Sequence, residues 1–395
     1  MGDTITGETQ LSSATRSQTV TVTGGSVRST VLPRVEWEGP HPKVQPSERH
    51  RFEELGLLGE GGMGEVVLAQ DHDIERQVAL KRLPENCDLG RVMRFVEEIR
   101  TVGQLEHPNI VPVHDVGIDA SGRYYFVMKK LNGETLETII DRLRSGDPAA
   151  EARFTIPVRL QIMLGVMNAL SYAHKQGYMH RDLKPANIMV GPHGEVTVMD
   201  WGLAKRVRTA DAPGSTDISF SKARTVLQTQ LGAIMGTPLY MSPEQARGAN
   251  DTLDERTDLY SLSVVFHELL FLKHYLKDVK QDVQSVLDGV KNLKPPRHGT
   301  TVNGKRIPAE LEWYLERGLE KDISKRYQSI AEMTEELQRI IRGECRVQCR
   351  RTFMKRMIGE AGKFNDQHPI ILLVGTLSVL GLFGAAIVKS VMVLL

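Results

Sequence analysis

Three oxygen-bearing side chains stand at fixed spacing in the stretch Tyr178–Gly202, which reads YMHRDLKPANIMVGPHGEVTVMDWG. Asp182 comes first, Asn187 follows five residues later, and Asp200 ends a short apolar run. Between them, two apolar runs flank the turn signal Gly191–Gly194, which predicts a β-hairpin. Such a hairpin would bring the three side chains into one small volume, as a site for Mg²⁺ and phosphate requires.

A second region with phosphate chemistry lies upstream, where residues 52–70 read FEELGLLGEGGMGEVVLAQ. The glycines follow the pattern G-x-G-x-x-G between two strand-like runs, and glycine lets backbone N–H groups approach a phosphate. A dinucleotide-binding fold would place a helix after such glycines, whereas a strand pattern follows here. Taken alone, the pattern is more often a simple turn.

One lysine and one glutamate follow the glycines. The run Gln77–Lys81 reads as a strand that ends in a lysine, which by itself is usually a solvated edge charge. The segment Arg91–Leu105 has apolar residues at helical spacing, and Glu98 is the acid on this helix that points inward. We therefore expect Glu98 to face Lys81.

These side chains need a scaffold, and the hydrophobic periodicity predicts one in two parts. Strand patterns within residues 52–131 indicate a small, mostly antiparallel sheet with one helix. Helical patterns then continue to about residue 342, at Leu136–Leu143, Val158–Gln176, Asp258–Phe271, Val279–Val290, Pro308–Glu320 and Ser329–Arg342. This order predicts an α+β fold of two lobes with a cleft between them.

Composition excludes several classes of protein. The chain has 395 residues, of which 41% are apolar and 25% charged, as is ordinary for one large globular domain or two. A net charge of +1 gives no reason to expect a nucleic-acid partner. The three cysteines form neither a disulfide framework nor a zinc pattern, so we expect thiols in a reducing compartment.

The two ends of the chain differ from the middle. Residues 1–50 are rich in Thr, Ser and Gly without strand or helix period, which predicts a disordered tail whose hydroxyls could be phosphorylated. Residues 370–388 contain no charge and would be about 28 Å long as a helix, enough to span a bilayer. A buried core helix is the alternative, although such helices rarely lack a polar face at this length.

The charges around this segment predict its orientation. The linker 343–369 is basic, whereas the short tail 389–395 contains only Lys389, so the positive-inside rule places residues 1–369 in the cytoplasm. The basic residues are Arg346, Arg350, Arg351, Lys355, Arg356 and Lys363. We expect a single-pass protein of the cell membrane. Gly381 and Ala385 are compatible with helix pairing in a homodimer, but small residues are equally expected in a lipid-facing helix.

Together, and in this order, the motifs resemble the protein kinase family across residues 52–342. Gly59-x-Gly61-x-x-Gly64-x-Val66 is similar to the glycine-rich loop over the ATP phosphates, and Val78–Lys81 to the lysine motif of the third strand. His180–Asn187 matches the catalytic loop. Asp200–Gly202 stands where the family has Asp-Phe-Gly, with Trp201 in place of the usual phenylalanine. This ring is bulkier but still apolar, so it should pack under the helix predicted at Arg91–Leu105.

The resemblance extends to residues downstream of the catalytic loop. Ser242–Glu244 stands where the family has Ala-Pro-Glu, and Asp258 and Arg326 fit its later helical anchors, with Arg326 expected to pair with Glu244. Lys184 resembles the serine/threonine class, and Gly236–Gly248 is similar to the eukaryotic-like serine/threonine kinases of bacteria. The resemblance implies a kinase N-lobe at 51–131 and a C-lobe at 132–342, whose activation segment is 200–244.

Catalytic roles follow from the resemblance. Asp200 and Asn187 would hold Mg²⁺, or Mn²⁺ in its place, and Asp182 would accept the proton of the substrate hydroxyl. Lys184 would stabilise charge on the transferred group, and Thr237 would bond both Asp182 and Lys184 and help to dock the acceptor.

The resemblance also implies an ATP site. Lys81 would hold the α- and β-phosphates and pair with Glu98, Met128 takes the gatekeeper position, and the backbone of Lys129–Leu131 would hydrogen-bond adenine. Val66 and Ala79 would sandwich the ring. The residues expected to bind ATP are Leu58, Gly59, Glu60, Gly61, Gly62, Met63, Gly64, Glu65, Val66, Ala79, Lys81, Glu98, Met128, Lys129 and Leu131.

We therefore predict an ATP-dependent serine/threonine kinase that phosphorylates proteins and itself. Arg181 beside the base suggests control by an activation-loop phosphate, with Thr229 as the first candidate and Thr225 as the second. A catalytically weak pseudokinase scaffold is the alternative, although Lys81, Asp182, Asn187 and Asp200 are all present. A small-molecule phosphotransferase of similar fold is disfavoured by the intact docking segment Thr237–Glu244.

Overall fold

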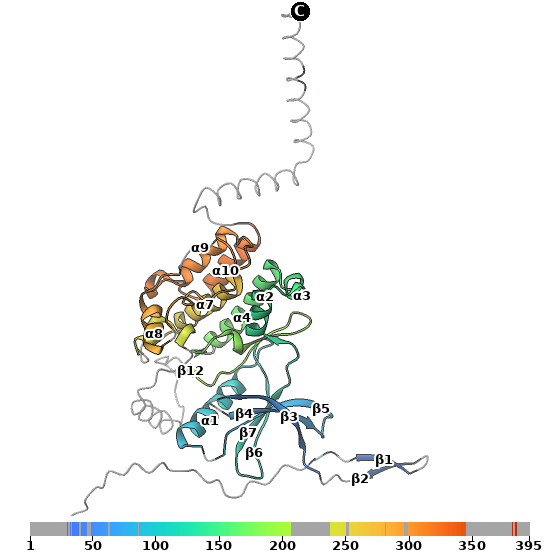
Figure 1. Ribbon diagram of the computed structural model, residues 1–395. Helices are drawn as coiled ribbons and strands as arrows, with labels where there is room; N and C mark the ends of the chain where they lie inside the picture. The colour runs from blue at the N-terminus through green and yellow to red at the C-terminus, as the bar shows by residue number, and fades with distance from the viewer. Residues whose placement is uncertain are drawn as a thin grey trace, which may run out of the picture.

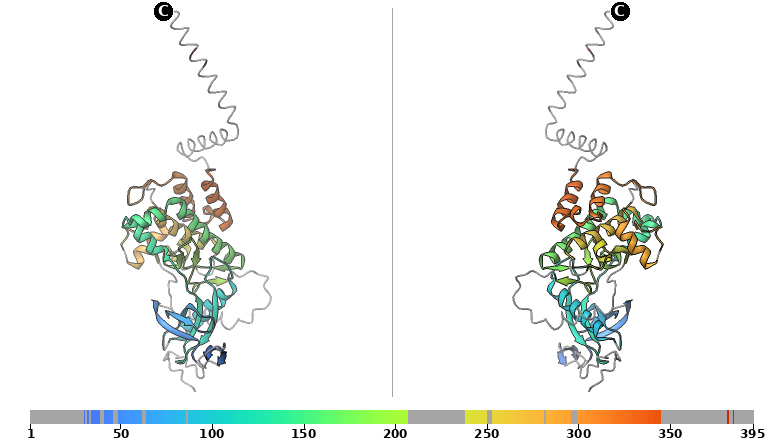
Figure 2. Two further views of the ribbon diagram at one scale, coloured as in Figure 1. Left: turned by 90° about the vertical axis from the view of Figure 1, so that its right-hand side faces the viewer. Right: turned by 90° about the vertical axis from the view of Figure 1, so that its left-hand side faces the viewer.

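The computed structural model describes residues 30, 32, 34–38, 41–45, 49–61, 64–85, 87–206, 238–249, 253–280, 282–295, 299–344, 381 and 384. A sheet lobe and a helical lobe follow one another along the long direction of the molecule (Figure 1). The same stacking is seen in both views turned by 90° (Figure 2). The predicted α+β arrangement of two lobes is confirmed in this part of the chain.

The sheet lobe contains a five-stranded antiparallel sheet with one long helix beside it (Figure 1). In spatial order the strands are β3 (Phe52–Gly61), β4 (Gly64–Asp71), β5 (Arg76–Arg82), β7 (Tyr124–Lys129) and β6 (Val113–Ile118). Helix α1 (Leu89–Gln104) begins at Asp88, whose side chain accepts a hydrogen bond from the N–H of Arg91. Its buried face includes Phe95, Glu98 and Val102, so the acid predicted to point inward does so.

The helical lobe is built around α7 (Arg256–Phe271), which is buried at every residue from Thr257 to Phe271. This helix is therefore the centre of the lobe, and the other helices pack around it (Figure 1). They are α2 (Leu136–Arg144), α3 (Pro148–Arg153), α4 (Ile156–Lys175), α6 (Pro243–Ala246), α8 (Val283–Asn292), α9 (Ala309–Gly318) and α10 (Ile330–Ile341). Helix α3 was not predicted, because six residues are too few to show a helical period.

Small sheets position the loops between the lobes. Strands β10 (Ile188–Val190) and β11 (Val196–Val198) form the predicted hairpin, and β8 (Glu134–Thr135) extends it on the β10 side. Strands β9 (Tyr178–Met179) and β12 (Lys205–Arg206) pair next to it. Asp182 and Asn187 lie between β9 and β10, and Asp200 lies between β11 and β12, so these short strands hold the loops that contain them.

One part of the expected disordered tail is corrected by the structure. Strands β1 (Arg34–Glu38) and β2 (His41–Gln45) pair antiparallel, within residues 1–50. Pro42 is tolerated in β2 because each strand of a two-stranded ribbon has one edge without hydrogen bonds. Residues 1–29 lie outside the described residues.

The predicted membrane segment also falls largely outside the described residues, which include only Gly381 and Gly384 of positions 370–388. The linker from 345 to 369 and the tail 389–395 lie outside them as well. In the part of the chain that the structure describes, no helix has the length and apolar character needed to cross a membrane.

Candidate active site

Side chains from the sheet lobe and from the β10–β11 hairpin meet at Lys81. Its Nζ atom lies 2.6 Å from Oε1 of Glu98 on α1 and 3.5 Å from Oδ1 of Asp200, the second residue after β11. The predicted pairing of Lys81 with Glu98 is therefore confirmed. One cation joins a helix, a strand and the loop that begins at Asp200.

Electrostatics keeps Lys81 and Asp200 charged, whereas burial raises the pKa of Glu98 above its ordinary value against the opposing charge of Lys81. Burial works to lower the pKa of Lys81, but the carboxylates of Glu98 and Asp200 raise it above the ordinary value. For Asp200, burial works to raise the pKa, and the positive charge of Lys81 is the largest of the effects that lower it below the ordinary value. The Asp200 side chain is still 41% exposed, so a negative carboxylate is accessible to a cation.

Asp182, Lys184 and Asn187 lie together in the loop between β9 and β10, where Asn187 ends a 3₁₀ turn, η1 (Pro185–Asn187). Lys184 Nζ donates to Asp182 Oδ2 at 2.8 Å, and Asn187 Nδ2 donates to the backbone carbonyl of Asp182 at 3.0 Å. The carbonyl of Asn187 accepts from the N–H of Met199 at 2.8 Å, which ties this loop to the strand leading to Asp200.

This arrangement fits a divalent cation. The amide nitrogen of Asn187 is used by the Asp182 carbonyl, so its oxygen is the atom that can ligate a metal. Together with the carboxylate of Asp200 it provides two hard oxygen ligands, and Mg²⁺ typically takes its remaining ligands from water and phosphate. Among the described residues, no group of three or more His, Cys, Asp or Glu side chains forms a self-sufficient metal site.

A buried aspartate on α7 fixes the start of the catalytic loop. Asp258 is 0% exposed and accepts from the backbone N–H groups of His180 and Arg181, both at 2.8 Å. The ring of His174 is also 2.8 Å from its Oδ2. Burial works to raise the pKa of Asp258, and the hydrogen bond with His174 is the largest effect that lowers it below the ordinary value. The role of Asp258 as an anchor, implied by the resemblance, is confirmed.

The loop backbone is held in an unusual conformation at two points. Arg181 has a φ of 67° and Asp200 a φ of 58°, in the left-handed region that favours glycine. Non-glycine residues in this region are often found at functional sites, where surrounding contacts fix them. Here the Asp258 hydrogen bond to Arg181 is one of those contacts.

The tryptophan that replaces phenylalanine is accommodated in the core. Trp201 is 1% exposed, and its indole lies with a centroid distance of 4.7 Å from the His180 ring. It belongs to the same apolar cluster as Val102 and Leu105 at the end of α1. The large ring is therefore accommodated in the apolar core, and its packing against α1 itself stays a prediction.

The glycine-rich stretch forms the ends of two paired strands, with Gly61 opposite Gly64. Leu58 to Gly61 belong to β3, and Gly64 to Val66 belong to β4, whereas Gly62 and Met63 lie outside the described residues. Gly64 has a φ of 135°, and a Cβ there would lie 2.0 Å from the carbonyl oxygen of Arg82. Only glycine therefore fits where β4 leaves the turn.

A charged ladder that sequence reasoning missed fixes the glycine turn on β4. Glu65 Oε1 accepts from Arg82 Nε at 2.6 Å and from Arg123 Nη1 at 3.3 Å. Arg82 also pairs with Glu54 on β3, and Arg123 donates to Asp119 at 2.8 Å. The ladder connects β3, β4 and β5 with the turn between β6 and β7. Its side chains are distant in sequence and meet through strand register, so no local sequence pattern predicts them.

The residues expected around adenine lie on neighbouring strands. Met128 of β7 is paired with Ala79 of β5, and Val66 of β4 is paired with Lys81 of β5. The N–H of Lys129 donates to the carbonyl of Pro112 at 3.2 Å, which fixes the end of β7. Leu131 follows β7 and packs against the main apolar core.

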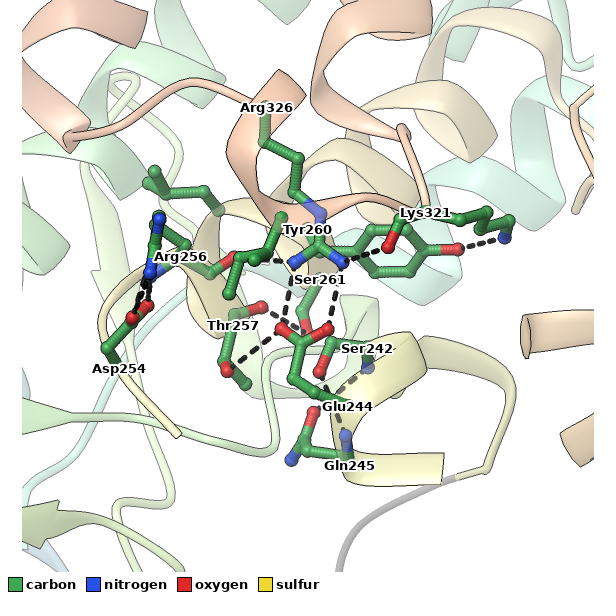
Figure 3. A network of polar contacts seen from close by, with 12 residues as sticks. Ser242, Glu244, Gln245, Asp254, Arg256, Thr257, Tyr260, Ser261, Lys321 and Arg326 are labelled. Atoms are coloured by element: carbon green, nitrogen blue, oxygen red, sulfur yellow. Dashed lines mark hydrogen bonds and ion pairs between the residues drawn. The ribbon is translucent and has the colours of Figure 1, made fainter. Parts of the chain in front are cut away.

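A buried ion pair holds the far end of the activation segment (Figure 3). The two terminal guanidinium nitrogens of Arg326, Nη1 and Nη2, each lie 2.8 Å from a carboxylate oxygen of Glu244, and Arg326 is 1% exposed. Gln245 donates to the carbonyl of Arg181 at 2.9 Å, which connects this segment to the catalytic loop. The predicted pair of Glu244 and Arg326 is confirmed. Thr225, Thr229 and Thr237 lie outside the described residues.

Comparison with known proteins gives consistent matches over this same region. The family described as protein kinase domain matches residues 52–338. The serine/threonine-protein kinase PknD of Protochlamydia amoebophila is 33% identical over 313 residues, which cover 75% of this chain and 30% of PknD. The probable serine/threonine-protein kinase SCO3848 of Streptomyces coelicolor is 35% identical over 74% of this chain and 40% of its own length.

A third relative gives the same result. The serine/threonine-protein kinase PknB of Mycobacterium tuberculosis is 34% identical over 308 residues, which cover 76% of this chain and 44% of PknB. The chain thus spans less than half the length of each of these three curated relatives.

Proposed function

Because the chain belongs to the protein kinase family, we propose that it transfers the γ-phosphate of ATP to serine and threonine hydroxyls of proteins. The observation that carries this proposal is the convergence of Asp182, Asn187 and Asp200 with the ion pair of Lys81 and Glu98. The three relatives are all named as serine/threonine-protein kinases, which supports the class of acceptor.

In this proposal the loop residues prepare the acceptor hydroxyl. Asp182 takes its proton as the oxygen becomes a nucleophile, and Lys184, 2.8 Å from the same carboxylate, places a positive charge beside the transferred group. Asn187 and Asp200 hold Mg²⁺, with Mn²⁺ as an alternative. ATP bound with the metal supplies the phosphoryl group.

The sheet lobe holds the nucleotide in the same proposal. Lys81 binds the α- and β-phosphates as an ammonium cation positioned by Glu98 and Asp200. The glycine turn covers the phosphates with backbone N–H groups, and the backbone of Lys129–Leu131 is assigned to adenine. Thr237 is assigned to acceptor docking.

We further propose that activity is controlled in the activation segment and at a membrane. A phosphate on Thr229, or on Thr225, would neutralise Arg181 and order the segment. A single span at 370–388 would place the kinase on the cytoplasmic side, and Gly381 and Ala385 would allow a homodimer. Loss of membrane association after deletion of 370–388 tests the anchor, and unchanged activity of the Thr225→Ala/Thr229→Ala variant would count against the switch.

The function is tested by incubating the full chain with γ-labelled ATP and Mg²⁺ and identifying the labelled residues by mass spectrometry. We expect phosphoserine and phosphothreonine, and their absence in Lys81→Met. If wild type transfers no label with either Mg²⁺ or Mn²⁺, the pseudokinase scaffold is the better interpretation. Label on tyrosine alone would contradict the acceptor class.

A further inference from the structure

Lys321 is a lysine of the helical lobe that the proposed phosphoryl transfer does not use. It follows α9 and precedes the 3₁₀ turn η3 (Ile323–Lys325), and it is partly exposed. Its Nζ atom lies 2.6 Å from the hydroxyl of Tyr260 on α7 (Figure 3) and 3.5 Å from the hydroxyl of Tyr275. The two hydroxyls are 2.8 Å apart. The amine therefore ends a short chain of hydrogen-bonding phenols.

The walls around this amine are aromatic. Its nitrogen lies 5.1 Å from the ring centroid of Tyr260 and 5.0 Å from that of Tyr275. Such ring faces attract a cation, but they replace only part of the hydration that a buried ammonium group loses. Aromatic walls alone therefore leave the charged form of Lys321 poorly solvated.

No acid of the described residues forms an ion pair with Lys321. The acids closest to it in charge effect are Glu320 and Glu244. Glu320 lies 3.6 Å from Lys294, and Glu244 is paired with Arg326. Both carboxylates thus have other cations as partners.

Two other cations add to the positive charge near Lys321. The guanidinium of Arg326 lies 4.9 Å from the Tyr260 ring, and its Nη2 donates to the backbone carbonyl of Lys321 at 3.3 Å. Arg247 follows α6 and is exposed. Burial is the largest effect that lowers the pKa of Lys321 to about 7, and the charges of Arg326 and Arg247 come next.

These surroundings favour the neutral amine, which is the nucleophilic form of lysine. An ordinary lysine is neutral in only about one molecule in a few thousand at pH 7. Desolvation and a neighbouring cation are the two means by which proteins make a lysine nucleophilic, and both act on Lys321.

We propose that Lys321 is a site of Nε-acylation by small acyl phosphates. The lone pair of the amine attacks the carbonyl carbon, so that the C–N bond of an amide forms and the C–O bond to phosphate breaks. Phosphate leaves with the electron pair of that bond, and the proton lost from nitrogen passes to solvent. A small donor suits an amine that is only partly exposed, and the exposed cation of Arg247 attracts its phosphate group.

Incubation of the full chain with acetyl phosphate in neutral detergent tests this assignment. Mass spectrometry of peptides cut after glutamate gives the initial rate of acetylation at each lysine. The internal control is Lys325, four residues further on, whose side chain is 68% exposed. At pH 7 we expect Lys321 to react about tenfold faster than Lys325, because its larger neutral fraction outweighs its lower basicity.

The pH profile separates a neutral amine from one that is merely accessible. Between pH 7 and pH 9 the rate at Lys321 should rise only about twofold, whereas at an ordinary exposed lysine it rises about tenfold per pH unit. Equal rates at Lys321 and Lys325 at pH 7 would overturn the proposal. So would a rate at Lys321 that rises about tenfold per pH unit.

A pair of variants tests the contribution of the neighbouring charge without changing Lys321. Arg247→Gln removes one like charge and should slow acetylation of Lys321 at pH 7 about threefold, whereas Arg247→Lys keeps the charge and should react at the wild-type rate. Melting temperatures establish that both variants are folded. Equal rates in wild type and Arg247→Gln would contradict the repulsion on which the proposal depends.

Discussion

The catalytic loop and the glycine turn serve the same site but are held by different kinds of contact. The loop depends on Asp258, which is fully buried and accepts two backbone hydrogen bonds. The glycine turn depends on Glu65, Arg82 and Arg123, whose side chains are 30%, 13% and 18% exposed. Buried polar anchors are costly to break, whereas exposed ion pairs each contribute about 0–1 kcal/mol and weaken with salt.

The difference separates the tasks of the two regions. The catalytic loop, which prepares the acceptor hydroxyl, is fixed by buried groups that water cannot replace. Its geometry should therefore stay the same at different salt concentrations and with or without bound nucleotide. On the nucleotide side, Lys81 and Glu98 form a buried pair, but the glycine turn itself is held by partly exposed pairs, so the turn can open and close over ATP at small cost.

Removal of the buried anchor should have the largest effect. We expect Asp258→Ala to lower the free energy of unfolding by about 3–5 kcal/mol, because backbone N–H groups of the catalytic loop lose their buried acceptor. Urea unfolding measures the change. The control Asp254→Ala removes a carboxylate that is 36% exposed and pairs with Arg256, and a loss of at most about 1 kcal/mol is expected there. Equal losses in both variants would contradict the comparison.

The free energy of unfolding should also depend on pH, because Lys321 is buried in the helical lobe. Lys321 lies between Tyr260 and Tyr275, 2.6 Å from the Tyr260 hydroxyl, and burial, with the charges of Arg326 and Arg247, lowers its pKa to about 7.

A lysine with this pKa in the folded state binds fewer protons above pH 7 than the unfolded chain does, so stability should rise from pH 7 toward pH 10. The slope is at most about 1.4 kcal/mol per pH unit. Unfolding midpoints across this range should show the rise in wild type and lose most of it in Lys321→Met. Parallel curves would be inconsistent with the low pKa.

At the glycine turn, we expect Gly64→Ala to destabilise the protein by about 1–2 kcal/mol and to raise KM for ATP. A Cβ would meet the Arg82 carbonyl, and alanine is strained at a φ of 135°. Thermal unfolding and initial rates measure the two effects. Gly59→Ala is the control for stability, since its Cβ would have open space and the free energy of unfolding should stay within about 0.5 kcal/mol.

The smallest effect is expected for the partly exposed ion pairs of the ladder around Glu65. Glu65→Gln should change stability by less than about 1 kcal/mol and raise KM for ATP about twofold to threefold at low salt. In wild type, salt should raise KM toward the value of the variant. A KM that stays constant with salt in both proteins would show that the ladder does not hold the turn.

Much of this site could be predicted from the sequence because its residues stand in short, contiguous motifs. The β10–β11 hairpin follows from two apolar runs around Gly191–Gly194, and Glu98 follows from the helical period of α1. Asp258 and the pair of Glu244 and Arg326 were found through the family resemblance.

Contacts set by strand register could not be predicted. The ladder through Glu65 requires Arg82 to lie opposite it in β5, and bulges between Glu54 and Gly56 and between Leu57 and Gly59 shift the register of β3. The hairpin of β1 and β2 was missed because five residues in each strand are too few to show a clear strand period.

The most direct test is the rate of phosphate transfer to a serine/threonine protein substrate by wild type and by Asp182→Asn. We predict a decrease in kcat of about 10²–10⁴, because the amide cannot accept the hydroxyl proton, with the melting temperature and ATP affinity unchanged. A kcat within about twofold of wild type in a folded, ATP-binding variant would contradict the assignment of Asp182 as the base.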